Sequence, residues 1–264
     1  MGKVYIDKNI LFLTNCQGTK GVAKFLLTVY NFKNVNLIRN YDLIRNKKDL
    51  PFNLLKNADI LIYQPISDRY GVYSSKNILK HIKSDCIKIS FPYLFINCLF
   101  PLCFTGIASS LEGGSIMDDN SILNSNIIKD LKKKYKTDEI IKMYYAQEIN
   151  FNFKKNYENN INRIKEKEKD CNIKLSYLFT LENISKVKLM NSYQHPTNYV
   201  YRYIFLEIVK ILNLPKTRIP EFKGEITPHS KTSYGIYSKK FYNLTWLKDE
   251  DLKDDCYINL IKII

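Results

Sequence analysis

The sequence predicts an α/β protein, a parallel-sheet sandwich with a helical insertion or cap, and two observations lead to this prediction. In the first hundred residues, short apolar runs typical of buried strands alternate with stretches of helical periodicity. From residue 121 to about residue 185 the chain is instead rich in Lys, Asn, Glu and Tyr, in the pattern of long helices. Strands and helices that alternate at this spacing favour a parallel sheet with right-handed crossovers.

Four strands are expected in the first part of the chain. They comprise residues 9–15, 35–44, 58–65 and 86–94. The third has a continuous apolar centre, as expected for a strand that is covered on both faces. A helix over residues 20–32 would place apolar side chains on one face, namely Val22, Phe25, Leu26 and Val29. A second helix is expected over residues 74–82, with Ser74 or Ser75 as its N-cap.

The middle of the chain is expected to be an insertion within a single catalytic domain that comprises residues 1–264. The insertion covers residues 121–185, and the mixed charges of its segment 156–179 indicate an exposed, solvated helix. The apolar run 93–108 is too short to span a bilayer and contains Pro101, so it favours a buried helix or the wall of a substrate pocket.

The last third is expected to begin with a helix that follows His195 and Pro196, because proline suits the first turn of a helix. Apolar and aromatic residues recur along this helix: Tyr199, Tyr203, Leu206, Val209 and Ile211. Residues 220–246 have little helical periodicity and are expected to wrap the surface.

Composition narrows the class of protein. A hydrophobic fraction of 45% in 264 residues supports a globular core. Lys plus Arg number 41 against 26 Asp plus Glu, which gives a formal net charge of +15. Such a surface favours polyanions: nucleic acid, anionic lipid or a phosphorylated small molecule. Abundant Lys and Asn also follow from an AT-rich genome, and this explanation carries equal weight.

The cysteines suggest reduced thiols in a cytoplasmic setting. Six are present, without CxxC pairs or zinc-like spacings: Cys16, Cys86, Cys98, Cys103, Cys171 and Cys256. No metal site is expected. The first residues are polar and strand-like, unlike a signal peptide, and no transmembrane segment is expected.

Three polar signals fall at strand ends or at a helix start. Asn15, Cys16, Gln17 and Gly18 follow the first strand, Gln64 and Pro65 follow the third, and His195 precedes the late helix. In open parallel sheets, ligands bind outside the carboxyl ends of the strands. If the fold brings these signals together, they supply a nucleophile, amide donors and a base.

Each of these residue types has a chemical role. A thiol in a strand-to-helix turn lies near outward-pointing N–H groups, and the helix dipole favours its thiolate. His195 could take a proton from Cys16 or from an acceptor hydroxyl. Asn15, Gln17 and Gln64 could donate hydrogen bonds to a developing oxyanion. Taken singly, a cysteine at a strand end is more often a small buried residue, and a lone histidine is more often structural.

Four sequence blocks together resemble the WcbI-type family of polysaccharide biosynthesis enzymes, regarded as acetyltransferases. The blocks are FLTNCQGTKGVAKFL, ADILIYQPISDRYGVYS, the aromatic-proline strand IKISFPYLF with the LFP that follows, and SYQHPTNYVYRYI. The resemblance covers residues 9 to about 105 and 187–212. It implies binding of coenzyme A, with acetyl-CoA as co-substrate, and acyl transfer to a sugar or sugar nucleotide of a surface glycan.

The blocks also look like a distant variant of SGNH-type hydrolases and acetyltransferases, whose sheet is Rossmann-like. By that likeness Cys16 would stand where the SGNH serine does, Gln64 near its amide position and His195 at its base. The usual aspartate three residues before the histidine is absent, because that position is Ser192. Another group must therefore orient His195, or the mechanism needs no full triad.

The leading hypothesis is an acetyl-CoA-dependent transferase that acts on a sugar hydroxyl or amine. Its catalytic residues would be Cys16, Gln17, Gln64 and His195. Coenzyme A binding is expected at Asn15, Gly18, Lys20, Arg69, Tyr93 and Arg202, and the cations among these are otherwise ordinary solvated side chains. Whether Cys16 forms an acyl-enzyme or lines the oxyanion pocket of a direct transfer stays open.

Two alternatives come from other classes. A glycan esterase or deacetylase could use the same residues. A nucleic-acid-binding protein could use the positive charge, although the sequence has no zinc finger, helix-turn-helix signature or RNP-like strand, so no nucleic-acid partner is expected. The acceptor sugar and the oligomeric state, including a homo-oligomer, are not set by the sequence.

Overall fold

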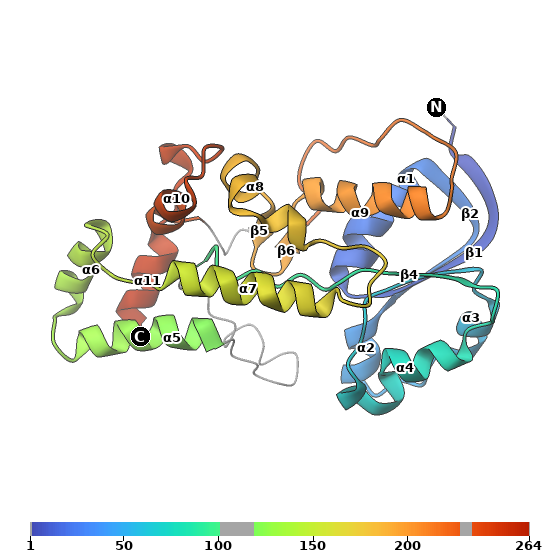
Figure 1. The fold of residues 1–264 in the computed structure, drawn as a ribbon, viewed down its shortest axis with the longest axis horizontal. Helices are drawn as coiled ribbons and strands as arrows, with labels where there is room; N and C mark the ends of the chain where they lie inside the picture. Colours follow the sequence, from blue (N-terminus) through green and yellow to red (C-terminus); the bar gives the residue numbers. More distant parts are fainter. Residues whose placement is uncertain (1, 101–118, 228–233, 264) are drawn as a thin grey trace. The chain divides into compact units, whose positions relative to one another are not determined.

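The computed structural model describes residues 2–100, 119–227 and 234–263 (Figure 1). Its contacts group the chain into two compact units. The sheet unit comprises Met1–Tyr93, Ile164–Ser176 and Pro196–Pro228, and the helical unit comprises Leu94–Arg163, Tyr177–His195 and His229–Ile264. The expected single domain with an insertion at about 121–185 stays a prediction.

The sheet unit contains the expected parallel sheet. Its four strands are β1 (Val4–Thr14), β2 (Tyr30–Arg39), β3 (Ile60–Tyr63) and β4 (Ile87–Ser90). They lie in the order β2-β1-β3-β4, and all three neighbouring pairs are parallel. The predicted α/β fold class is therefore confirmed.

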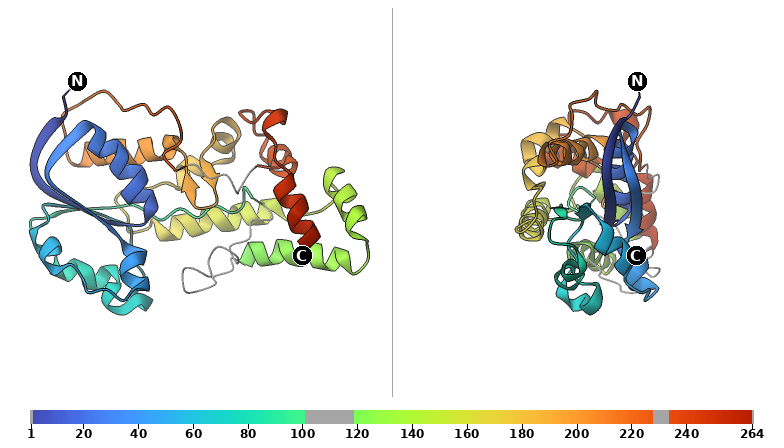
Figure 2. Two further views of the ribbon diagram at one scale, coloured as in Figure 1. Left: turned by 180° about the vertical axis from the view of Figure 1, so that it is seen from behind. Right: turned by 90° about the vertical axis from the view of Figure 1, so that its right-hand side faces the viewer.

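Helices cover both faces of this sheet, as Figures 1 and 2 show. On one face Leu11 and Leu13 join an apolar cluster with side chains of three helices. These are α2 (Asn40–Arg45), α3 (Phe52–Asn57) and α4 (Ser75–Ile78). On the other face lie α1 (Ala23–Val29) and α9 (Asn198–Ile211), which contact each other. Side chains alternate along a strand, so Ile10 and Phe12, both 0% exposed, point to that second face.

Several element boundaries differ from the sequence prediction: β1 begins at Val4 and β2 at Tyr30, each five residues before the predicted start, and β4 ends at Ser90, four residues before the predicted end. The expected strand 35–44 ends at Arg39, because Arg39 is paired with Thr14, the last residue of β1, and α2 begins at once. The expected helix 20–32 ends at Val29, since Tyr30 opens β2 and its buried hydroxyl donates to the Pro215 carbonyl at 2.7 Å.

Short helical turns complete the sheet unit: the π-helix η1 (Gln17–Val22) and the 3-10 helices η2 (Asp68–Tyr73) and η3 (Leu79–His81). The start of α4 confirms the predicted cap, because the Ser74 hydroxyl accepts the Asn77 N–H at 3.3 Å. In α9 three of the residues named in the sequence, Tyr199, Leu206 and Ile211, are exposed. The buried side chains of α9 are Val200, Tyr201, Ile204, Phe205 and Ile208.

The helical unit is built mainly from helices. They are α5 (Asp119–Lys132), α6 (Thr137–Tyr145), α7 (Phe153–Lys167), η5 (Ser176–Phe179), α8 (Leu181–Lys186), α10 (Ile236–Tyr242), η6 (Asp249–Asp251) and α11 (Asp255–Ile263), with one end of α7 and of η5 in the sheet unit. A separate two-stranded sheet pairs β5 (Met190–Ser192) with β6 (His195–Pro196). The residues predicted to be helical in the middle of the chain are thus largely helical, whereas α10 lies in the tail that was expected to lack helix.

Aromatic rings fill the core of the helical unit. The rings of Tyr237 and Phe151 meet edge to face at 4.9 Å, and the same tyrosine packs at 4.9 Å against Tyr144. Buried phenols donate to backbone carbonyls: Tyr234 to Met190 at 2.7 Å and Tyr242 to Cys98 at 3.0 Å. These bonds satisfy polar groups that would be costly to bury alone.

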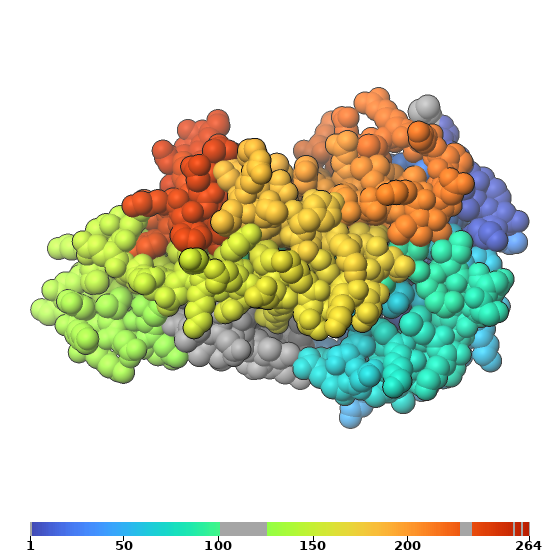
Figure 3. All heavy atoms as spheres, viewed as in Figure 1, coloured from blue at the N-terminus to red at the C-terminus, as the bar shows by residue number. Residues whose placement is uncertain are grey.

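Helix α7 confirms the expected solvated face. Its exposed side chains include Lys154, Lys155, Glu158, Asn162, Lys165 and Glu166. In Figure 3 the atoms of this helix, yellow-green to yellow, lie at the surface of the face shown.

The apolar run 93–108 is only partly described. Its first part is non-helical and is buried from Leu94 through Phe100, and the rest, which includes Pro101, lies outside the described residues. In the part of the chain that the structure describes, no helix has the length and hydropathy needed to cross a bilayer.

Candidate active site at the carboxyl edge of the sheet

The Cys16 thiol lies at the point where β1 passes into a helix. β1 ends at Thr14, Cys16 takes helical backbone angles, and the π-helical turn Gln17–Val22 continues directly into α1. Cys16 is half-buried. π-Helical turns of this kind occur frequently at functional sites. The predicted position of the thiol, at a strand end and a helix start, is therefore what the structure shows.

Two glycines allow this turn to pack closely. A side chain at Gly18 would place its Cβ 2.1 Å from the Thr14 hydroxyl oxygen, so only glycine fits there without a shift. A Cβ at Gly21 would lie 2.3 Å from the ring of Tyr201 on α9. The first glycine therefore lets the turn fold back on β1, and the second lets α9 pack against the helix that carries Cys16.

A network of amides holds the turn to the neighbouring strand. The Gln64 side-chain oxygen accepts the Asn15 N–H at 2.8 Å, and the Gln64 amide donates to the side-chain oxygen of Gln17 at 3.3 Å. The Asn15 side chain accepts the Gln17 N–H at 2.8 Å. Gln17 and Gln64 are each 1% exposed. Because both ends of the Gln64 amide are engaged, this side chain fixes the geometry of the Cys16 turn.

The network lies at the topological switch point of the sheet. The chain leaves β1 toward β2 on one side and leaves β3 toward β4 on the other, so the carboxyl ends of β1 and β3 flank the point where the winding reverses. Asn15 and Gln17 follow β1, and Gln64 follows β3. In open α/β sheets the crevice at this point is where ligands bind.

Two tyrosines near Cys16 were not recognised in the sequence. Burial raises the pKa of Tyr41, with an opposing effect of Arg39 and a smaller rise from Cys16. Burial likewise raises the pKa of Tyr201, and Cys16 adds to that rise as well. Both phenols therefore lie within electrostatic range of the sulfur. Arg39 and Tyr41 were missed because the strand was expected to continue to residue 44. Had its end been placed at Arg39, both residues would have been recognised as lying at the carboxyl end of a strand.

The predicted cofactor-binding cations of the sheet unit occupy different places. Lys20, in η1, and Arg202, in α9, are exposed. Arg69 is exposed in η2, which follows β3. Its guanidinium donates to the Tyr70 hydroxyl at 2.9 Å and lies 4.8 Å from the centre of that ring. The half-buried ring of Tyr93 has the Lys167 ammonium 5.0 Å from its centre. Their roles toward a ligand stay predictions.

The half-buried His195 has an orienting partner within the helical unit. Its Nδ1 lies 2.9 Å from the hydroxyl oxygen of Ser192, which is 1% exposed. The turn between them is held by a backbone bond of 2.8 Å from the Ile96 N–H to the Tyr193 carbonyl. Ser192, which stands at the position where SGNH-type enzymes have an aspartate, therefore orients the His195 imidazole.

The residue after His195 is anchored in the sheet unit. The Pro196 carbonyl accepts the Thr227 hydroxyl at 3.2 Å, and that hydroxyl lies 3.0 Å from the Tyr201 hydroxyl. Glu225 also caps α9, since its carboxylate accepts the Asn198 N–H at 2.7 Å. Pro196 is thereby tied to the helix that packs on Gly21. Because His195 itself belongs to the helical unit, its convergence with Cys16 stays a prediction.

Other thiols differ from Cys16 in their surroundings. Burial raises the pKa of Cys171 to about 11 and also raises the pKa of Cys86. Both are therefore protonated at neutral pH and poor nucleophiles. Among the residues that the structure describes, no group of three or more His, Cys, Asp or Glu side chains could hold a metal ion.

The Cys16 turn, held by amides at the switch point of a parallel sheet, lies where open α/β proteins bind their ligands. The family model described as "Polysaccharide biosynthesis enzyme WcbI" matches residues 9–217. The chain belongs to this family of polysaccharide biosynthesis enzymes. The resemblance seen in the sequence motifs is thus confirmed.

A solved structure supports the fold. It is a structure of WcbI, described as a novel polysaccharide biosynthesis enzyme, in the native form without a disulfide bond between coenzyme A and a cysteine. The similarity covers 98% of each chain at 12% sequence identity, with a TM-score of 0.61. A search of the curated proteins finds no match.

Proposed function

We propose that this protein transfers an acyl group, specifically acetyl, from coenzyme A to a sugar hydroxyl or amine during polysaccharide biosynthesis. The observation that carries the proposal is the half-buried Cys16 thiol at a helix start, held at the switch point by Asn15, Gln17 and Gln64. Membership in a family of polysaccharide biosynthesis enzymes supports a glycan acceptor. The solved WcbI structure, whose description names coenzyme A and a cysteine, supports the donor.

The residues of the sheet unit fit a phosphorylated thioester. The helix start at Cys16 places the positive end of the helix dipole at this edge of the sheet. Arg39 ends β2, Lys20 lies in η1 six residues beyond β1, and Arg69 lies in η2 six residues beyond β3. These cations would attract the phosphates of coenzyme A. The helix start at Cys16 and these cations thus suit the thioester and the anionic end of coenzyme A.

Direct transfer would proceed in two balanced steps. Nε2 of His195 takes the proton from the acceptor hydroxyl, and the oxygen attacks the thioester carbon to form a tetrahedral oxyanion. The carbon–sulfur bond then breaks, and the coenzyme A thiolate takes the proton from the imidazolium. Ser192 would hold the ring through Nδ1 in both steps, without the charge that a carboxylate brings to the imidazolium.

Cys16 offers a second route with the same residues. His195 would take the proton of the Cys16 thiol, and the sulfur would attack the thioester carbon. Coenzyme A would then take this proton from His195 and depart as the free thiol, and the acetyl group would remain on Cys16. The acceptor would then attack this intermediate. In either route an N–H of the Gln17 or Gln64 side-chain amide would donate to the thioester oxygen, since each NH2 carries two donors and the bond between these residues uses only one N–H of Gln64.

Acetyl-CoA consumption with and without an acetylatable glycan tests the proposal. We expect acceptor-dependent release of coenzyme A, and loss of about 10²–10³-fold in rate for His195→Ala. Mass measurement of the intact protein, after incubation without acceptor, separates the routes, because only the covalent route adds an acetyl group to Cys16. Release of acetate from an acetylated glycan, without use of acetyl-CoA, would instead identify an esterase. A wild-type rate in His195→Ala would exclude the role given to that residue.

A further inference from the structure

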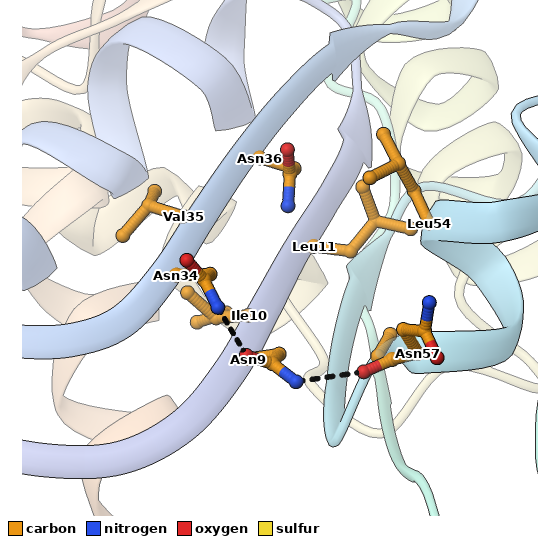
Figure 4. A pocket seen from close by; sticks show the side chains of 9 residues that line it. Asn9, Ile10, Leu11, Asn34, Val35, Asn36, Leu54 and Asn57 are labelled. Atoms are coloured by element: carbon orange, nitrogen blue, oxygen red, sulfur yellow. Dashed lines mark hydrogen bonds between the residues drawn. The ribbon is translucent and has the colours of Figure 1, made fainter.

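The sheet unit contains a second concave site, remote from Cys16. A pocket of about 410 Å³ opens beside the edge strand β2, between the β1–β2 pair and α3 (Figure 4). Asn9 on its floor precedes Thr14, the end of β1, by five residues, which is about 16 Å along a strand. The pocket is therefore separate from the carboxyl edge of the sheet.

Four asparagine side chains gather in this pocket from different elements. Asn9 comes from β1, Asn34 and Asn36 come from β2, and Asn57 ends α3. The strand register explains the gathering, because Asn9 is paired with Asn34 and Leu11 with Asn36. Partners in neighbouring strands point to the same face. All four asparagines therefore belong to the α3 side of the sheet.

Hydrogen bonds fix the centre of this cluster. The Asn34 amide donates to the Asn9 side-chain oxygen at 2.8 Å, and the Asn9 amide donates to the Asn57 carbonyl at 3.0 Å, as the dashed lines of Figure 4 show. The Asn9 N–H is in turn held by Asp59 at 2.7 Å. With Asn9 fixed, the Asn36 and Asn57 side-chain amides have no protein partner among the described residues. They are partly or fully exposed at the pocket.

The chemistry of the lining selects the class of ligand. None of the described lining residues carries a charge, in a chain with 41 Lys plus Arg and 26 Asp plus Glu. Each asparagine amide presents both donors and an acceptor, which matches hydroxyl groups that also donate and accept. The half-buried Leu54 adds an apolar side chain that suits the C–H face of a sugar ring. The lining residues offer no opposite charge to an ionic ligand.

From this we infer that the asparagine pocket binds a neutral saccharide, as a glycan-holding site distinct from the site of chemistry. A polysaccharide enzyme gains from such a site, because holding a chain at a second point raises the local concentration of its reacting end. The inference goes beyond the proposed acyl transfer and does not depend on it, since binding needs neither acetyl-CoA nor Cys16.

The test is saccharide binding by saturation-transfer NMR, together with ¹⁵N spectra of the asparagine side-chain amides. The probes are maltohexaose and cellohexaose as neutral saccharides, and a galacturonic acid oligomer as the charged comparison. Asn36→Asp and Asn57→Asp keep the side-chain shape but replace the donating amide by a carboxylate. Asn53→Asp is the matched control, because Asn53 is exposed on the same helix but does not line the pocket.

We expect at least one neutral hexasaccharide to bind and to shift the Asn36 and Asn57 amide signals. Binding should weaken about tenfold in each pocket variant and stay unchanged in Asn53→Asp. The inference is overturned if neither neutral probe binds, if the galacturonic acid oligomer binds more tightly, or if either pocket variant binds as the wild type does. A thermal shift with coenzyme A, measured on the same variants, reports separately on the proposed function.

Discussion

One face of the sheet unit, the face covered by α2, α3 and α4, and the core of the helical unit achieve burial with different side chains. That face packs aliphatic residues such as Leu11, Leu13 and Leu61, whereas the opposite face of the same sheet also buries the rings of Phe25 and Phe205. The helical unit packs rings whose hydroxyls are bonded to backbone carbonyls, as in Tyr234 and Tyr242. The first arrangement leaves a polar edge where the strands end, whereas the second uses its polar atoms to hold its own core.

This difference shows how perturbed ionisation should be interpreted in this molecule. Burial raises the pKa of Tyr234 and Tyr242, yet both phenols donate to backbone carbonyls inside the core. The raised pKa values of these two phenols therefore result from burial in the core and do not indicate a functional site. At the carboxyl edge of the sheet the informative feature is instead the convergence of Cys16 with the amide side chains of Asn15, Gln17 and Gln64.

The largest expected effect is on catalysis in the sheet unit. Cys16→Ala should lower acetyl transfer by about 10²–10³-fold or more, because the thiol is lost as nucleophile or as part of the oxyanion pocket. Cys86→Ala is the matched control in the same unit, since Cys86 is a buried core residue. Initial rates with acetyl-CoA and acceptor measure both. Equal rates in the two variants would remove Cys16 from the mechanism.

Thiol reactivity should separate Cys16 from the buried cysteines. The pKa of Cys171 is raised to about 11, so at pH 8 only about 10⁻³ of it is thiolate, and its alkylation should become appreciable only as the pH approaches that value. The half-buried Cys16 should react at least tenfold faster at pH 8. Peptide mass spectrometry after timed iodoacetamide treatment gives both rates. Faster labelling of Cys171 would contradict the burial described for it.

Close packing of the Cys16 turn should appear in stability. Gly18→Ala should lower the free energy of unfolding by about 1–3 kcal/mol, because its Cβ would meet Thr14 at 2.1 Å. Gly224→Ala is the control, since a Cβ there meets nothing within 4 Å. Chemical denaturation followed by circular dichroism compares them. A Gly18→Ala protein as stable as the control would mean that the turn is looser than described.

The smallest expected effect concerns the helical unit alone. Tyr234→Phe leaves the Met190 carbonyl without its phenol donor and should cost about 1–2 kcal/mol of stability. The rate of acetyl transfer should not change at a temperature where the variant is folded. Thermal unfolding and rate measurement on one preparation test both. A rate loss larger than the loss of folded protein would give Tyr234 a role in chemistry.

The sheet unit was largely predictable because its signals are local. Apolar runs at strand spacing predicted β1 and β3, and the turn at Asn15, Cys16 and Gln17 could be placed at a strand end. The end of β2 at Arg39 could not be placed, since the apolar pattern continues into α2 and the limit is set by pairing with Thr14.

The helical unit was less predictable because its core forms through distant contacts. Helix α10 has little periodicity, and its Tyr237 and Tyr242 are buried by rings and carbonyls from remote segments. The orientation of His195 was also hidden: Ser192 stood three residues away, but only the fold shows that its hydroxyl lies on Nδ1. Hydrogen bonds such as those of Gln64 likewise need coordinates.

Protection of Cys16 by coenzyme A tests the central claim most directly. Alkylation of each cysteine is timed by peptide mass spectrometry, with and without saturating coenzyme A under reducing conditions. If the switch point binds the thioester end of the co-substrate, labelling of Cys16 should slow at least about tenfold at 100 times the dissociation constant, while labelling of Cys86 and Cys171 stays unchanged. An unchanged rate at Cys16, under conditions where coenzyme A demonstrably binds the protein, would place the co-substrate elsewhere and contradict the account.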